Sequence, residues 1–89
     1  MLKIKEGFIL REVGGTSCVV AVGKASKNFK GMITLNETGV LLFKELLNGS
    51  TKELLTQKLL NEYEIDELTA ECDVEDFIMK LLDGGIIEQ

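Results

Sequence analysis

The sequence predicts an α+β fold in which a three-stranded antiparallel sheet precedes a bundle of three helices, an arrangement similar to that of winged helices. Two observations predict it. Up to residue 35, short apolar runs with β-branched residues are separated by glycines, as in strands and turns. From residue 37 onward, apolar residues recur at helical spacing. Asn36, a residue type that caps helices, stands at the change.

Length and composition limit the class of protein. The chain has 89 residues, which predicts one domain over residues 1–89. It is 45% apolar and 28% charged, as in ordinary globular proteins. It has no apolar run long enough for a membrane span and no secretion signal after Met1, so a cytoplasmic location is expected. Cys18 and Cys72 lie in apolar patterns and are expected to be reduced, packed thiols.

The first half of the chain is expected to form a meander of three strands. Phe8–Val13 and Thr16–Val22 flank a Gly-Gly pair that is suited to a tight hairpin. The apolar residues of Thr16–Val22 do not alternate with polar ones, which favours the central place in the sheet. Met32–Leu35 supplies the third strand. In the polar connection before it, Phe29 is expected to contact the core.

Two helices are expected next. The first runs over residues 37–47 and begins with a carboxylate, which the helix dipole favours there. The second is expected to begin with a capping box at Ser50–Glu53. In such a box the Ser50 hydroxyl and the Glu53 carboxylate each accept a hydrogen bond from an otherwise free N–H. This helix is expected to end near Tyr63.

The third helix is expected to begin at Asp66 or Thr69 and to run to about Asp83. Its buried face is predicted by the helical spacing of four apolar residues, namely Ala70, Val74, Phe77 and Leu81. Two glycines end the helix. Residues 86–87, both isoleucine, are expected either to dock on the core or to add a short strand.

The sequence offers little for catalysis. It contains no His, the commonest general base and metal ligand, and no glycine-rich phosphate loop. Paired carboxylates such as Asp73 and Asp76 fall on polar faces, where a solvated surface is the ordinary explanation. The protein is therefore not expected to be an enzyme, and no cofactor or metal ion is expected.

The charges divide unequally along the chain. Residues 1–35 carry six basic and two acidic side chains, whereas residues 36–89 carry four basic and thirteen acidic ones. The expected third helix is strongly acidic and would be repelled by nucleic-acid phosphates. Binding to nucleic acid by a winged helix therefore stands only as an alternative.

The outer strand Met32–Leu35 is a candidate binding edge. Edge strands present unpaired N–H and C=O groups, and proteins usually guard them with charge. The first strand and its approach carry five charged residues, whereas Met32–Leu35 carries none. Two interpretations are open: the third helix or residues 86–87 cover this edge, or an extended peptide adds to it as a fourth strand. Pairing with a second copy at this edge is also open.

The faces of this strand follow from its period of two residues. If Ile33 and Leu35 point to the core, Met32 and Thr34 point away, and a shift of one residue reverses the assignment. Replacing Ile33 with Pro is expected to remove an N–H donor from the edge.

A family resemblance covers nearly the whole chain. Residues 31–39, Gly-Met-Ile-Thr-Leu-Asn-Glu-Thr-Gly, resemble the signature of the PqqD family (pyrroloquinoline quinone biosynthesis protein D). The end of the chain is similar to the family's second pattern at Asp73-Val74, Phe77, Leu81 and Gly85-Ile86-Ile87. The chain departs from its relatives at Phe43, where they often have Trp, but both are bulky core residues.

The resemblance implies a function and a site. Members of the family act as RiPP recognition elements, which bind the leader segment of a ribosomally made precursor peptide. They are non-catalytic chaperones that present the leader to a modifying enzyme, commonly a radical S-adenosylmethionine enzyme. The leader adds as a strand in the groove between the third strand and the third helix. Carried over to this chain, the resemblance implies these contact residues: Met32, Ile33, Thr34, Leu35, Asp73, Asp76, Phe77 and Lys80.

The expected partners are therefore a precursor peptide and its modifying enzyme, without nucleic acid or membrane. Acidic residues of the third helix are expected to select basic leader residues. A module that binds some other protein segment is the remaining alternative. The resemblance does not by itself assign the quinone pathway, because related domains serve many peptides.

Overall fold

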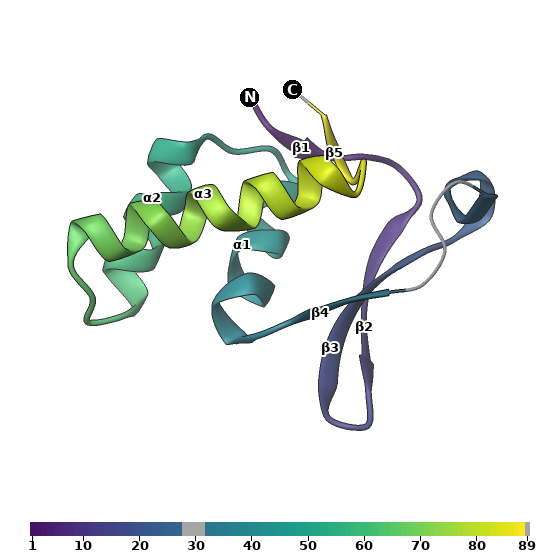
Figure 1. The fold of residues 1–89 in the computed structure, drawn as a ribbon, viewed down its shortest axis with the longest axis horizontal. Coiled ribbons are helices and arrows are strands. Elements are labelled where there is room, and N and C mark those ends of the chain that lie inside the picture. Colours follow the sequence, from purple (N-terminus) through teal and green to yellow (C-terminus); the bar gives the residue numbers. More distant parts are fainter. Residues whose placement is uncertain (28–31, 89) are drawn as a thin grey trace.

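The computed structural model describes residues 1–27 and 32–88, so the expected contact of Phe29 lies outside the described residues. Figure 1 shows three helices gathered on one side, a twisted sheet on the other and the two chain ends close together. In chain order the elements are β1 (Lys3–Ile4), β2 (Phe8–Val13), β3 (Thr16–Ala21), the 3₁₀ helix η1 (Gly23–Lys27), β4 (Met32–Leu35), α1 (Glu37–Leu47), α2 (Lys52–Glu62), α3 (Glu67–Asp83) and β5 (Ile87–Glu88).

The expected α+β architecture is confirmed. Strands β2, β3 and β4 form an antiparallel sheet in that order, with β3 in the centre. Val13 and Thr16 pair directly across a two-residue turn. Gly14 and Gly15 have φ angles of 57° and 81°, the signs that a type I′ hairpin turn requires. This turn matches the right-handed twist of the strands that it joins.

Helices α1 and α3 begin at the caps that the sequence predicts. The side chain of Asn36 accepts a hydrogen bond from the Gly39 N–H at 2.9 Å. At the start of α3, the carboxylate of Asp66 accepts one from the Thr69 N–H at 2.8 Å, so Asp66 is the cap and Thr69 is not. Each cap satisfies an N–H that has no partner within the helix.

The expected cap of α2 is wrong by one residue. Thr51 caps this helix, and its hydroxyl accepts a hydrogen bond from the Leu54 N–H at 3.1 Å. Ser50 is instead buried, and its backbone exchanges two hydrogen bonds with Leu2, at 2.7 and 2.8 Å. The chain before α2 is thus held by the N-terminal segment, which moves the helix start one residue later.

The hydrophobic core lies between the inner face of the sheet and the helices. The residues that are wholly or almost wholly buried include Val19, Leu42, Phe43, Leu46, Leu55, Leu59, Ala70, Val74, Ile78, Leu81 and Ile86. The predicted face of α3 is right at Ala70, Val74 and Leu81, but Ile78 completes it. Phe77 is only half-buried at the side of this stripe.

The two cysteines differ, contrary to the expectation that both are packed. Cys18 is buried in the central strand, whereas Cys72 is exposed on α3. Cys72 lies two positions from both Ala70 and Val74, so it points away from the buried stripe of its helix.

The two ends of the chain are joined by a second small sheet. Strand β5 pairs with β1 in the register Ile4↔Ile87, and the Lys5 N–H donates to the Ile86 carbonyl at 2.8 Å. Ile86 is fully buried in the core. Docking and strand formation both occur here, and β5 pairs with β1, not with β4. Among the described helices, none is long and apolar enough to cross a membrane.

Candidate functional site

The register of the sheet tells which backbone groups of β4 face outward. Residues that face each other in antiparallel strands alternate between hydrogen-bonded and non-hydrogen-bonded pairs. Two-residue hairpins close on a hydrogen-bonded pair, here Val13 and Thr16. The Val22 N–H donates a hydrogen bond to the Gly7 carbonyl at 2.7 Å. This pair is an even number of residues away from the Val13–Thr16 pair on each strand, so it fits the same alternation.

The alternation continues into the next pair of strands. In β3, the backbone groups of alternate residues form hydrogen bonds with β2, namely those of Thr16, Cys18 and Val20. The backbone groups of Ser17 and Val19 point the other way and form hydrogen bonds with β4. Their partners are Leu35 and Ile33. The N–H and C=O groups of Ile33 and Leu35 therefore point to β3.

The free edge consequently belongs to the other two residues of β4. The N–H and C=O groups of Met32 and Thr34 point away from β3. The expectation that Pro at position 33 removes an edge donor is therefore wrong, because the Ile33 N–H is part of the sheet. Thr34 is the position at which Pro removes an edge donor.

The side chains of β4 alternate as the sequence predicts. Leu35 is buried and Ile33 half-buried, whereas Met32 and Thr34 are exposed. Ile33 points toward the end of α3, since a Cβ placed on Gly84 would lie 3.6 Å from the Ile33 Cδ1. The strand thus turns one apolar face to the helices, and among residues 1–27 and 32–88 its only strand partner is β3.

A groove of about 490 Å³ lies between β4 and α3. Six of the eight residues that the family resemblance implies line it, namely Thr34, Leu35, Asp73, Asp76, Phe77 and Lys80. Met32 and Ile33 are absent from its lining, and they lie further back along β4. In Figure 1, β4 runs from the sheet into α1, and α3 crosses above this junction.

The groove combines an apolar base with a charged rim. Leu35 and Leu42 are buried and Phe77 is half-buried, so they supply apolar surface. Asp73, Asp76 and Lys80 are exposed on α3, and in the described part of the chain none of them takes part in an ion pair. These charges remain available to a bound molecule.

Sequence reasoning missed four residues of the lining: Asn36, Thr38, Gly39 and Leu42. The sequence assigned residues 36–39 only to the start of a helix, but the cap brings α1 against the end of β4. A Cβ at Gly39 would lie 3.3 Å from the Leu35 Cβ and 3.2 Å from the Asn36 Oδ1. Glycine thus permits this close approach. The signal was the immediate succession of edge strand and helix cap.

The groove has no arrangement typical of a metal centre. Over residues 1–27 and 32–88, no three Cys, Asp or Glu side chains are grouped so that they could hold a metal ion. The chemistry that the groove offers is apolar contact, charge and the open backbone groups of β4.

The family of the chain follows from a comparison with family models. Residues 8–87 match the model described as Coenzyme PQQ synthesis protein D (PqqD). The chain belongs to the PqqD family. This confirms the resemblance that residues 31–39 and the end of the chain carry. No curated protein matches the chain in sequence.

Two solved structures share the fold of this PqqD-family chain. One is titled TbiB1 in complex with the TbiA(beta) leader peptide; its TM-score is 0.76 at 20% identity, and the match covers 97% of this chain and 94% of that one. The other is titled lasso peptide synthetase B1 complexed with the leader peptide; its TM-score is also 0.76 at 20% identity, with 99% and 98% covered. At this identity the likeness concerns the fold.

Proposed function

We propose that this chain is a non-catalytic adaptor that binds the leader segment of a ribosomally made precursor peptide and presents it to a modifying enzyme. The leader adds as a strand to the outer edge of β4, in the groove against α3. The observation that carries the proposal is the uncharged, outward-facing edge of β4 beside that groove. Membership of the PqqD family and the two leader-peptide complexes with this fold support it.

Backbone hydrogen bonds supply affinity in this proposal. Met32 and Thr34 offer two N–H donors and two C=O acceptors at the edge. An extended leader pairs with these groups as a fourth strand, in the mode called β-augmentation. Because backbone groups are common to all peptides, this contact does not choose between leaders.

Side chains supply the choice. In an added strand, the residues opposite Ile33 and Leu35 point to the same side as these two, toward α3. These two leader residues are separated by one other residue of the leader. The side chain opposite Leu35 enters the groove beside Phe77, so an apolar residue fits there. The neighbouring carboxylates of Asp73 and Asp76 favour Lys or Arg nearby.

The decisive experiment titrates isotope-labelled protein with the leader of a precursor peptide encoded beside the gene. Amide shifts are expected in residues 32–39 and 73–80, which surround the groove. Thr34→Pro removes an edge N–H, so the leader loses a backbone hydrogen bond and binding is expected to weaken by about tenfold or more. Pro is tolerated at sheet edges that face solvent, so the variant is expected to fold. Thr34→Val keeps the N–H and a similar shape, so it is expected to bind within about twofold of the original.

Two results would overturn strand addition. One is the absence of shifts in both segments at a leader concentration that saturates the protein by another readout. The other is unchanged leader affinity in a folded Thr34→Pro protein. An Ile33→Pro protein serves as the structural comparison, because it loses a bond within the sheet and is expected to be less stable.

The identity of the modifying enzyme is the finer part of this proposal. A radical S-adenosylmethionine enzyme is the expected partner, and the cytoplasm is the expected site of action. A concentration-dependent mass in the absence of leader would reveal pairing between two copies at β4 in competition with the leader. Retention on DNA that falls with salt would favour the nucleic-acid alternative, which the acidic α3 disfavours.

A further inference from the structure

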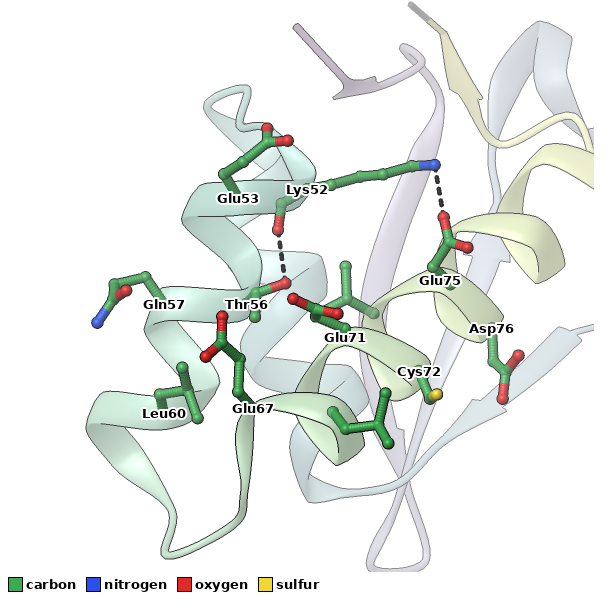
Figure 2. Close-up of a pocket in the computed structure, with 12 residues that line it drawn as sticks. Lys52, Glu53, Thr56, Gln57, Leu60, Glu67, Glu71, Cys72, Glu75 and Asp76 are labelled. Atoms are coloured by element: carbon green, nitrogen blue, oxygen red, sulfur yellow. Dashed lines mark hydrogen bonds and ion pairs between the residues drawn. The ribbon is translucent and has the colours of Figure 1, made fainter.

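A second cavity lies on another side of α3. It is a cleft of about 650 Å³ between α2 and α3, larger than the groove beside β4. Figure 2 shows its two walls, with Thr56 and Leu60 on α2 and Glu71 and Cys72 on α3. Asp76 lines both cavities, so α3 is a wall shared between them. The function proposed above makes no use of this cleft.

Apolar side chains are exposed to solvent at the cleft. Leu68, in the first turn of α3, is 69% exposed, a high value for leucine. Leu60 and the buried Val74 contribute apolar surface beside it. An exposed leucine is ordinary when it stands alone, but here it borders a concave surface. Such a surface gains stability when an apolar side chain from a partner fills it.

Negative charge surrounds this apolar surface. The lining holds five carboxylates and one ammonium group: Glu53, Glu67, Glu71, Glu75, Asp76 and Lys52. The ammonium of Lys52 reaches across from α2 to the Glu75 carboxylate at 2.6 Å (Figure 2). Both side chains are more than half exposed, and such surface pairs contribute little to stability. The pair can therefore open to admit a partner.

The cleft differs from the β4 groove in what it offers to a partner. Its walls are two helices, whose backbone groups bond within each helix. No backbone edge is available here, so a partner is held by its side chains. An amphipathic helix laid into a groove between helices satisfies this condition. The surplus of carboxylates requires that helix to be basic.

We propose that the cleft between α2 and α3 docks a basic amphipathic helix of a second protein while the leader occupies the groove at β4. The proposal rests on the proposed function, in which that second protein is the modifying enzyme. The two sites lie on different sides of α3 and share only Asp76 in their linings, so the helix that holds the leader also contacts the enzyme. An adaptor needs two such surfaces to bring its partners together.

The test uses a synthetic helical peptide of about 18 residues as the probe, with leucines along one face and arginines beside them. A control peptide has serines in place of the leucines and carries the same charge. Labelled protein is titrated with each, with and without saturating leader. Shifts from the leucine peptide are expected in residues 52–60 and 67–75, with leader affinity changed by less than about twofold. The serine peptide is expected to bind about tenfold more weakly.

Two leucine variants form a matched pair for the same titration. Leu68→Ser removes apolar surface from the cleft and is expected to weaken the probe about tenfold. Leu54→Ser changes a leucine that is 59% exposed on α2 outside the cleft, and is expected to leave probe binding unchanged. Because both side chains are exposed, neither change threatens folding.

Three outcomes would overturn the inference. They are equal binding of the serine peptide, equal binding to the Leu68→Ser protein, and displacement of the probe by leader. Either of the first two outcomes would mean that the probe is attracted only by the negative charge of the surface. The third outcome would mean that the probe and the leader share a single site. If the leader fails to bind while the probe depends on Leu68, the leader proposal fails and the docking surface alone stands.

Discussion

Asp66 links the charge of one carboxyl group to the stability of a helix. Hydrogen bonds from the Thr69 hydroxyl and backbone N–H hold the pKa of the Asp66 carboxyl below its ordinary value of 3.8. A carboxyl whose pKa is lowered in the folded state stabilises that state above its unfolded pKa. This stabilisation is lost as the pH falls through the lowered folded value.

The prediction is that Asp66→Asn makes the protein less sensitive to acid. Asn also caps helices through its side-chain oxygen, but it does not titrate. The wild type is expected to lose more unfolding free energy than Asp66→Asn when the pH falls from about 6 to about 2.5. Denaturant unfolding at the two pH values measures this difference. Equal losses in the two proteins would contradict it.

At the scale of single residues, the sequence predicted the elements better than it predicted which of their apolar side chains enter the core. Phe77 and Ile78 are adjacent on α3, and helical spacing fits either one to the face of Ala70 and Val74. Packing decides between them, since Ile78 enters the core and Phe77 lines the groove. Cys72 is a different case, because its place two residues from both Ala70 and Val74 already puts it off the buried face, and only its apolar neighbours suggested that it was packed. Tertiary contacts that distinguish neighbouring residues are not encoded in the helical period.

Among the elements, the β2–β3 hairpin determines how β4 presents its edge. The turn of this hairpin determines which residues of β3 form backbone hydrogen bonds with β2 and which form them with β4. That choice in turn leaves Met32 and Thr34 facing outward. A change in this turn therefore affects the sheet beyond the turn itself.

The turn itself carries the second prediction. Gly15 has φ of 81°, where a Cβ costs about 1–2 kcal/mol, and no atom lies close enough to add a steric clash. Gly15→Ala is thus expected to lower the unfolding free energy by about 1 kcal/mol. Gly14→Asn gives the Asn-Gly pair favoured in type I′ turns and is expected to keep the original stability. Urea unfolding separates the two, and an equal loss in both would argue against a type I′ turn.

Most elements could be predicted because each one has a local signal. Residues 8–13, 32–35 and 37–47 were predicted with the bounds that the structure has, from apolar patterns, glycines and a capping residue. The short strands β1 and β5 were not both foreseen, because each has two residues and exists only by pairing with the other. The start of α2 was missed for a similar reason, since Ser50 pairs with Leu2 far away in the sequence.

For the whole molecule, the candidate site lies where the two differently charged halves of the chain meet. Strand β4 ends the basic half, and α3 belongs to the acidic half. The sequence could indicate the unguarded edge, and the family resemblance added the facing helix. Neither could show that residues 36–42 complete the groove, because that depends on how closely α1 approaches β4.

Because the groove joins the sheet to the helices, a bound leader is expected to stabilise the entire fold. A ligand at one hundred times its Kd adds about 2.7 kcal/mol to the unfolding free energy. For a domain of this size, that corresponds to a rise in Tm of roughly 10–20 °C. Thermal unfolding with and without leader measures the shift.

Two variants distinguish binding at β4 from binding elsewhere. At the same leader concentration, the Thr34→Pro protein is expected to show little rise in Tm, because its leader affinity is reduced. The Leu68→Ser protein is expected to show the full rise, because the proposed leader site at β4 does not include Leu68. A full rise in Thr34→Pro would place the leader away from the β4 edge, and a lost rise in Leu68→Ser would place it in the cleft.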